Sequence, residues 1–387
     1  MKYCLSVCEL NPLHYGHIKL ISEMKSRGDA VIMIMSGNFC QRGEAAVMNK
    51  YARARHAVLA GADMVVELPA VFSCAPAEIF AKGAIKLLSA IKGEKTLFFG
   101  AECGDREDFL KISDVLANES KEFKRVLKEE LKLGSPFAAA RLNALKKTTD
   151  ADLKLLETPN SILGLEYAKA IKFFGSDMDI CPVRRENNYS DKEFGKGYCS
   201  SLAVREAIEC GKRKKAKGYI PDYVYGDLPT ELPDFSAPAL YSIMRSDAKD
   251  LKMITDCSEG LENRIKAIAR GVRSLDELID RLETRRYTRA RLKRIVTANM
   301  LGIDRELTEK CLKASLYLKV LAIKEDRRDL LSLKTDKVPL LTRKTDLEKL
   351  SGTSRECFSK DVFACDLYSL VTNSKFNEFE MKVIKKQ

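Results

Sequence analysis

The chain has 387 residues, of which 45% are hydrophobic and 32% charged, a composition that excludes disordered and fibrous proteins. Its length fits two globular domains, or one large domain with an appendage. No apolar run approaches the ~18 residues of a membrane-spanning helix, and Glu9 and His14 stand where a signal peptide would need apolar or small residues, so we expect a cytoplasmic protein without membrane contact. The formal net charge of +12 favours a polyanionic partner such as a nucleic acid.

The twelve cysteines are scattered along the chain, and many lie inside apolar runs. We interpret them as reduced core residues rather than as a disulfide framework. No C-x-x-C pair occurs and the chain has three histidines, so a Cys/His zinc site lacks its usual spacing. No metal held by protein side chains is expected.

The first half of the chain alternates short apolar runs with helix-like segments. Predicted strands lie at 3–10, 30–36, 63–68, 96–100 and 178–183, and predicted helices at 17–27, 49–59 and around 204–208. Nearly continuous apolar strands separated by helices favour an α/β fold with a doubly wound parallel sheet. Ligands bind such sheets beyond the carboxyl ends of the strands, which here are the loops 11–17 and 37–43 and the turn after Gly100.

The remainder of the chain is predicted to be mostly helical. Residues 105–175 are interpreted as a helical insertion, residues 211–238 as an irregular connection, and the pattern from about Leu240 onward as helical. We therefore expect an α/β domain over residues 1–212 and a mainly helical C-terminal domain over residues 213–387.

Two of the three histidines, His14 and His17, flank Gly16 at the turn between the first strand and the first helix. Backbone N–H groups and the dipole at a helix N-terminus form an anion site, and two imidazoles three residues apart can add hydrogen bonds to phosphate oxygens. Gly16 lets a nucleotide approach the backbone, and Pro12 stiffens the turn. The pattern predicts a nucleotide-phosphate site; the alternative is a pair of ordinary surface histidines.

A second pattern, Cys199-Ser200-Ser201-Leu202-Ala203-Val204-Arg205, opens a later helix. Ser200 and Ser201 can cap the helix and donate hydroxyl hydrogens to phosphate. Arg205 can neutralise charge that develops on a pyrophosphate leaving group. Taken alone, the pattern fits a plain N-cap with a surface arginine equally well.

Together the two patterns resemble the paired motifs of the HIGH nucleotidylyltransferases and class I aminoacyl-tRNA synthetases. Longer strings are similar to the tRNA(Met) cytidine acetate ligase family, as far as about residue 300. They are ELNPLHYGHIKLI, MSGNFCQRGEAAVMNKYARARHAVLAGADMVVELP, LFFGAE, TPNSILGLEYAKAI, CPVRREN, SEGLENRIKAIAR and RRYTRARLKRIV. The resemblance implies activation of acetate by ATP to acetyl-adenylate, followed by acetylation of N4 of the wobble cytidine of elongator tRNA(Met).

The resemblance also implies the residues of the site. His14, His17 and Arg205 would be catalytic, and acetate and elongator tRNA(Met) would be the substrates, with no protein partner predicted. Mg²⁺ is expected with the triphosphate, although no protein ligand is identified. The ATP-binding residues would be Val7, Asn11, Pro12, His14, Gly16, His17, Leu20, Gly100, Asn160, Arg185, Ser200 and Ser201. A small-molecule adenylyltransferase and a non-catalytic RNA-binding protein with a nucleotide fold stay as alternatives.

Several polar residues lie outside these motifs. Asn38, Gln41 and Arg42 follow the second strand and are candidates for tRNA or acyl-site contacts, or form only a polar turn. Lys50 and Arg53 follow on a helix, where a solvated face would explain them as well.

The strongest basic concentration lies at residues 264–294, with eleven Lys or Arg against four acids. Its end, RRYTRARLKR, contains no acid, which predicts RNA contact. Tyr287 would stack on a base while the neighbouring arginines bind phosphates. The predicted tRNA-binding residues are Arg285, Arg286, Tyr287, Arg289, Arg291 and Arg294. The basic run at 211–217 either adds to this surface or is a solvated linker.

Overall fold

The computed structural model describes residues 1–134, 137–185 and 199–385. Its centre is an eight-stranded sheet in the order β5-β4-β1-β2-β3-β6-β7, with β8 paired to β6. The strands are β1 (Lys2–Cys8), β2 (Ala30–Ser36), β3 (Met64–Leu68), β4 (Glu94–Ala101), β5 (Asp179–Arg184), β6 (Leu318–Lys324), β7 (Leu340–Leu341) and β8 (Lys382–Ile384). All pairs among β1 to β5 are parallel, whereas β3 and β6 are antiparallel. The predicted parallel α/β sheet is confirmed, within a mixed sheet of mostly parallel strands.

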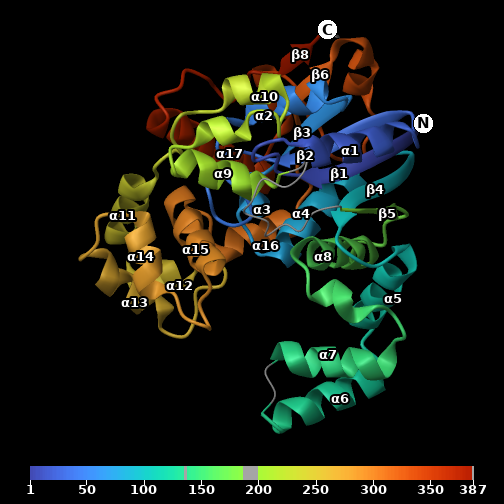
Figure 1. Cartoon of the computed structure of the whole chain (residues 1–387), viewed down its shortest axis with the longest axis vertical. Coiled ribbons are helices and arrows are strands. Elements are labelled where there is room, and N and C mark those ends of the chain that lie inside the picture. The colour runs from blue at the N-terminus through green and yellow to red at the C-terminus, as the bar shows by residue number, and fades with distance from the viewer. Residues whose placement is uncertain (135–136, 186–198, 386–387) are drawn as a thin grey trace.

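Helices pack against this sheet and also extend away from it (Figure 1). They are α1 (Tyr15–Lys25), α2 (Lys50–Leu59), α3 (Ala70–Ser73), α4 (Ala77–Ser89), α5 (Arg106–Ala117), α6 (Lys121–Lys132), α7 (Phe137–Thr148), α8 (Pro159–Phe173), α9 (Ser201–Glu209), α10 (Asp222–Asp227), α11 (Ser236–Arg245), α12 (Ala248–Lys252), α13 (Leu261–Ala269), α14 (Leu275–Leu282), α15 (Arg289–Leu301), α16 (Arg305–Lys313) and α17 (Gly352–Val371). Short 3₁₀ helices are η1 (Leu153–Leu156), η2 (Arg213–Ala216), η3 (Glu325–Ser332) and η4 (Lys344–Lys349).

The sheet separates two layers of apolar side chains. Strand β2 is buried along its whole length, so successive residues alternate between the layers. Val31 and Met33 pack with Ile21 of α1, whereas Ile32 and Ile34 pack in the layer that contains Phe80 of α4. A strand buried on both faces is typical of parallel sheets covered by helices.

The chain order places a crevice next to β1. From β1 the chain builds β2 and β3 on one side, and β4 and β5 on the other. In the register, Cys4 of β1 lies opposite Val31 of β2 and opposite Thr96 of β4. The loops that follow β1 and β4 therefore diverge at the carboxyl edge of the sheet, which is where open α/β sheets bind ligands.

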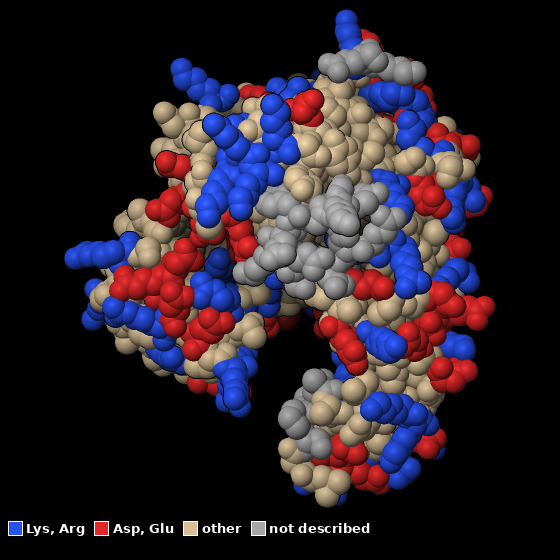
Figure 2. Space-filling model, viewed as in Figure 1, with Lys and Arg blue, Asp and Glu red and all other residues tan. Residues whose placement is uncertain are grey.

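Two groups of helices extend away from the sheet (Figure 1). Helices α6 and α7 pack on each other at the far end of the 106–173 segment, and α11 to α15 form a second group. Figure 2 shows a hollow between these two groups. The division at residues 212 and 213 stays a prediction.

The prediction of a helical pattern from Leu240 onward is wrong for residues 318–324. These residues form β6, which pairs antiparallel with β3, and β7 and β8 pair with β6 in turn. The seven residues LKVLAIK include two lysines, and the segment is too short for its periodicity to distinguish a strand from a buried helical segment. The C-terminal part of the chain thus completes the N-terminal sheet.

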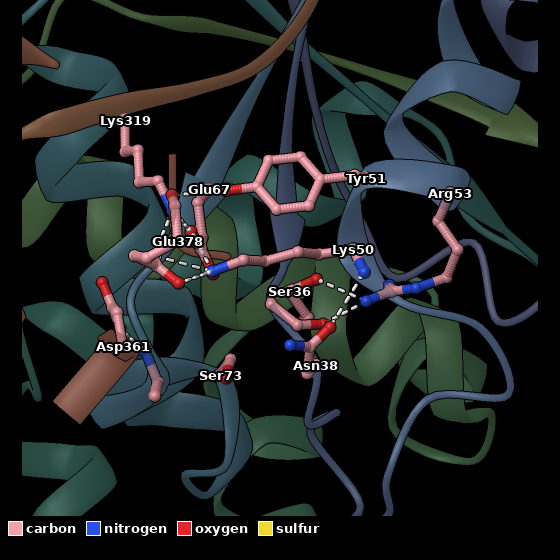
Figure 3. A network of polar contacts seen from close by, with 12 residues as sticks. Ser36, Asn38, Lys50, Tyr51, Arg53, Glu67, Ser73, Lys319, Asp361 and Glu378 are labelled. Atoms are coloured by element: carbon pink, nitrogen blue, oxygen red, sulfur yellow. Dashed lines mark hydrogen bonds and ion pairs between the residues drawn. The ribbon is translucent and has the colours of Figure 1, made fainter. Parts of the chain in front are cut away.

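A buried ion cluster fastens the C-terminal strands to the N-terminal ones (Figure 3). Lys50 Nζ lies 2.8 Å from a carboxylate oxygen of Glu67 and 2.7 Å from one of Glu378, and Lys319 contacts both carboxylates. All four side chains are at most 5% exposed. The explanation of Lys50 and Arg53 by a solvated helix face is therefore wrong, since Arg53 is also fully buried.

Arg53 joins the ends of two strands through backbone oxygens. Its guanidinium donates to the carbonyl oxygens of Glu9, after β1, and of Ser36 and Gly37, at the end of β2. A guanidinium group carries five N–H donors in one plane, so it can donate to several carbonyl oxygens at once. Arg53 thereby holds together the sheet edge from which the site is built.

All twelve cysteines are free thiols, and most of them are buried. Among the described residues, no helix combines the length and the apolar character needed to cross a membrane.

Candidate active site

The turn that contains the two histidines is held by hydrogen bonds to both rings. His14 is the N-cap of α1; Gly16 N–H donates to His14 Nδ1 at 3.0 Å, and His14 N–H donates to His17 Nδ1 at 3.2 Å. The ring centroids are 3.9 Å apart. Because each Nδ1 accepts a hydrogen bond, the proton of each neutral ring lies on Nε2. Both rings therefore offer an N–H donor beside the helix N-terminus.

Burial, helped by nearby positive charge, keeps both rings neutral. Burial, followed by the positive charge of Arg185, lowers the pKa of His14 to about 3. Burial lowers the pKa of His17 well below its usual range, and His14 and Arg185 lower it further. At neutral pH the turn thus presents hydrogen-bond donors without resident charge.

Gly16 is required by the position of the His14 ring. A Cβ atom built on Gly16 would lie 2.8 Å from His14 Cε1 and 3.0 Å from His14 Nδ1. Any side chain at this position would displace the imidazole that caps α1. The sequence prediction gave Gly16 a role toward the nucleotide, and the structure adds this second role within the turn.

The structure brings the second motif against the first. Ser201 Oγ donates to Pro12 O at 2.9 Å, and Arg205 Nη1 donates to Asn11 O at 2.6 Å. Ser200 caps α9 through the N–H of Ala203 at 3.0 Å. The N-termini of α1 and α9 therefore face the same space, and the serines and Arg205 also hold the backbone of the histidine turn in place.

An open cleft with about 1220 Å³ of empty space lies at this edge of the sheet. Most of the predicted ATP-site residues line it: Val7, Asn11, His14, His17, Leu20, Gly100, Asn160, Arg185, Ser200, Ser201 and Arg205. An adjoining pocket of about 600 Å³ shares both histidines and adds Gly16 and Val183. Pro12 is buried and contributes through its carbonyl oxygen.

Asn160 is positioned by an acid that the sequence reasoning missed. Glu102 follows β4, and its carboxylate accepts from the side-chain amide of Asn160 and from Ser161 N–H, the latter at 3.0 Å. The only signal in the sequence was its place in the string LFFGAE. Glu102 thereby fixes the N-terminus of α8 against the cleft.

Glu9 is a second acid that the sequence reasoning missed. It follows the end of β1 and lines the cleft, and its Oε1 accepts from Gln41 N–H at 2.6 Å. Burial raises the pKa of Glu9 above its ordinary value. Gln41 and Arg42 also line the cleft, whereas Asn38 is buried and accepts from Lys50 N–H at 2.8 Å.

The loop at 37–45 connects the cleft to the helical group α11–α15. Glu44 lies 3.7 Å from Arg205 and 3.0 Å from Lys293 of α15. Thr297 Oγ1 of α15 donates to Gly43 O at 2.9 Å. One carboxylate thus touches both a cleft-lining arginine and the helical group.

The predicted RNA segment at 285–294 does not line the cleft, and its charges are largely paired. Tyr287 is 9% exposed, and the guanidinium groups of Arg286 and Arg291 lie 6.0 and 5.0 Å from its ring centre. Arg286 pairs with Glu259, and Arg289 with Asp280 and Glu283. Glu259 comes from a neighbouring loop, whereas Asp280 and Glu283 are two of the four acids counted within residues 264–294, and a count of charges does not show which of them pair. RNA contact by this segment stays a prediction.

The lysines of the basic run at 211–217 are exposed to solvent. Lys212, Lys214, Lys215 and Lys217 are exposed, and none of them has an ion-pair partner among the residues that the structure describes. Figure 2 shows Lys and Arg side chains gathered over α9 and α10, which flank this run. The run therefore forms an unpaired positive patch close to the start of α9.

The described residues contain no group of three or more His, Cys, Asp or Glu side chains suited to hold a metal ion.

Comparisons with known proteins agree with this geometry. The family model described as HIGH Nucleotidyl Transferase matches residues 1–382. The tRNA(Met) cytidine acetate ligase of Caldanaerobacter subterraneus subsp. tengcongensis is 36% identical over 379 residues, 94% of each chain. The enzyme of the same name from Caldicellulosiruptor saccharolyticus is 38% identical, over 83% of this chain and 82% of the other.

Solved structures resemble the chain over its whole length. The crystal structure of apo Thermotoga maritima TmcAL covers 100% of both chains with a TM-score of 0.90 and 28% identity. The same protein bound with alpha-thio ATP has a TM-score of 0.86 and 30% identity, over 96% of this chain and 95% of the other.

Proposed function

The chain belongs to the HIGH nucleotidyl transferase family, and within it to the tRNA(Met) cytidine acetate ligases, and from this premise we propose that it acetylates a tRNA cytidine at the expense of ATP. The activated intermediate is acetyl-adenylate, and the acceptor is N4 of the wobble cytidine of elongator tRNA(Met). The observation that carries the proposal is the neutral histidine pair at the N-terminus of α1, which lines the cleft together with the start of α9.

In the first step the acetate oxygen attacks the α-phosphorus of ATP in line, and pyrophosphate leaves. The Nε2–H groups of His14 and His17 donate to phosphate oxygens as charge develops. Arg205, which already donates to Asn11 O, holds the turn and adds positive charge at the same edge. Positioning and fixed donors supply most of the acceleration, as is general for reactions at phosphorus.

The metal requirement is part of the proposal. The described residues provide no carboxylate cluster for a divalent ion, so Mg²⁺ would enter with the triphosphate. When bound, it would neutralise charge on the pyrophosphate. His14, His17 and Arg185 would hold and orient the phosphates.

The tRNA would contact the face that carries the exposed lysines. Lys212, Lys214, Lys215 and Lys217 lie three to eight residues past α9, whose first turn lines the cleft. When a lysine without an ion-pair partner neutralises a phosphate, the counterion condensed on the RNA is released, which favours binding. An arginine that is already paired with an acid contributes less, because its charge is partly neutralised before the RNA binds. The segment 285–294 is the second candidate surface.

The test follows labelled acetate and labelled pyrophosphate. Wild-type protein should catalyse acetate-dependent exchange of pyrophosphate into ATP, and should transfer label from acetate to elongator tRNA(Met). His14→Ala and His17→Ala should each lower the exchange about 100- to 1000-fold, because a lost donor of this kind typically costs that much.

The arms of the experiment separate the alternatives. Label from the adenine of ATP that stays in a small-molecule product would indicate an adenylyltransferase. RNA binding without any exchange would indicate a non-catalytic binding protein. Unchanged exchange in a folded His14→Ala, His17→Ala double variant would refute the assignment of the histidine pair.

A further inference from the structure

The cleft extends beyond the histidines into a part that is lined by an acid and by aromatic side chains. The adjoining pocket and the cleft share His14 and His17, whereas Glu9, Gln41, Phe80 and Tyr167 line only the cleft. The histidines therefore stand between two regions. The predicted ATP-site residues Asn160 and Ser200 also line the cleft, so the nucleotide would reach into it, and the acceptor base would meet the activated acetyl group in the part that Glu9 and the aromatic side chains line.

Glu9 is the acid of that second region. Its Oε1 is fixed by Gln41 N–H at 2.6 Å, and its Oε2 has no hydrogen-bond partner among the described residues. Because Glu9 follows β1 directly and Arg53 holds its carbonyl oxygen, the position of the carboxylate is set by the sheet edge itself.

The walls near Glu9 are aromatic. Phe80, Phe99 and Tyr167 line the same cleft, and the rings of Phe99 and Tyr167 are 5.9 Å apart in an edge-to-face arrangement. Sites that receive an unstacked base combine aromatic walls with a few polar groups for its edge. A carboxylate is the side chain that accepts from the exocyclic amine of cytosine and repels the O4 of uracil.

We propose that Glu9 binds the N4 amino group of the target cytidine and removes its proton during acetyl transfer. This inference rests on the proposed function. N4 forms a bond to the acetyl carbonyl carbon, and the bond from that carbon to the phosphate oxygen of acetyl-adenylate breaks. AMP leaves with the electron pair, and one N4 proton passes to Glu9 Oε2 and later to water.

The electrostatic surroundings of Glu9 suit this role. Burial raises its pKa, and Glu44 raises it further, while Gln41 N–H, Arg205 and Arg53 lower it. The other ionisable groups facing it are the thiols of Cys8, Cys40 and Cys74 and the phenol of Tyr167. Burial raises the pKa of each of these groups, so they stay neutral, and Glu9 is the base of the set.

The test separates the two steps of the reaction in full-length protein. Acetate-dependent pyrophosphate exchange reports the first step. The second is measured by adding an RNA hairpin, copied from the anticodon arm with cytidine at the target position, to enzyme preloaded with ATP and labelled acetate. Glu9→Gln keeps the size and an acceptor for Gln41 N–H, and should lower the transfer rate at least about 100-fold more than the exchange.

Two further readouts exclude a purely structural role. The wild-type transfer rate should rise with pH through the pKa of Glu9, and this limb should persist in Glu9→Asp and vanish in Glu9→Gln. The ratio of the binding constants for the cytidine hairpin and for a hairpin with uridine at that position, which has no amine to acetylate, should fall about 10-fold or more in Glu9→Gln. Glu78→Gln, an exposed acid of α4, is the matched control and should behave as wild type.

The outcomes are distinct. Equal losses of exchange and transfer in Glu9→Gln, or an unchanged pH limb, would overturn the inference while the proposed function stands. Absence of acetate-dependent exchange in wild type would overturn the proposed function, and this inference with it.

Discussion

The buried ion cluster of Lys50, Glu67, Lys319 and Glu378 should make one carboxylate in the C-terminal tail essential for stability. Glu378 contacts both lysines, and the cluster is neutral with two charges of each sign. Glu378→Gln keeps the shape but leaves two buried cations facing one anion. Removing one partner of a buried pair costs about 3 to 5 kcal/mol, and we expect the upper end, because Glu378 serves two lysines.

The measurement is the free energy of unfolding from urea titrations. Glu380→Gln is the matched control, because Glu380 pairs with Lys382 at a partly exposed site in the same tail, where a pair contributes about 0 to 1 kcal/mol. The double variant Glu378→Gln, Lys319→Met restores equal numbers of buried charges and should be at least about 1 kcal/mol less destabilised than the sum of the single variants. A loss below about 1 kcal/mol for Glu378→Gln, or strict additivity, would refute the reasoning.

Three further predictions concern a buried acid, the histidine turn and the basic surfaces. Burial, with repulsion by neighbouring acids, raises the pKa of Asp361 to about 7. The contribution of this carboxyl group to stability is therefore full below its unfolded pKa of about 3.9 and is lost as pH rises through about 7. The unfolding free energy of wild type relative to Asp361→Asn should fall between pH 4 and 7 by up to about 1.4 kcal/mol per pH unit, and a pH-independent difference would contradict this. Gly16→Ala should displace His14 and lower pyrophosphate exchange about 100-fold with an unchanged circular dichroism spectrum; full activity would show that the ring is not fixed as described. Replacing the four exposed lysines of the 211–217 run by glutamine should flatten the salt dependence of tRNA binding by up to about 3 units of log K per log salt. The same change at Arg285, Arg286, Arg289 and Arg291 should have a smaller effect, because three of these arginines already bind groups within the chain. The reverse order would place the RNA surface on the second segment.

The features that could be predicted from the sequence depend on residues that are close together along the chain. The strand predicted at 30–36 has the bounds of β2, because seven consecutive buried residues leave a continuous apolar run. The helix expected at 49–59 is α2, whose N-cap is Asn49, a residue that favours this position. The anion-binding turn was visible because His14 and His17 sit three residues apart at a strand-to-helix junction.

The features that it missed depend on partners far along the chain. Lys50 looked like a surface residue, because its partner Glu378 lies 328 positions away. The run around Tyr287 looked unpaired, because Asp256 and Glu259 reach it from a different loop. Glu9 precedes the histidine motif, but nothing in the sequence pattern marked it as functional. Its proposed role depends on the aromatic side chains that α4 and α8 bring to the same cleft.

The antiparallel pairing of β6 with β3 has a consequence for protein synthesis. Val66 pairs with Val320, so β3 leaves the ribosome long before its neighbour exists. Until then it is an open apolar edge, and Lys50 and Glu67 lack two of the side chains that balance them. Such edges invite pairing with other nascent chains. Chaperone protection should therefore matter most during translation of residues 69–317, and chains cut short before β6 should be degraded or aggregate rather than accumulate as a free nucleotide-binding fragment.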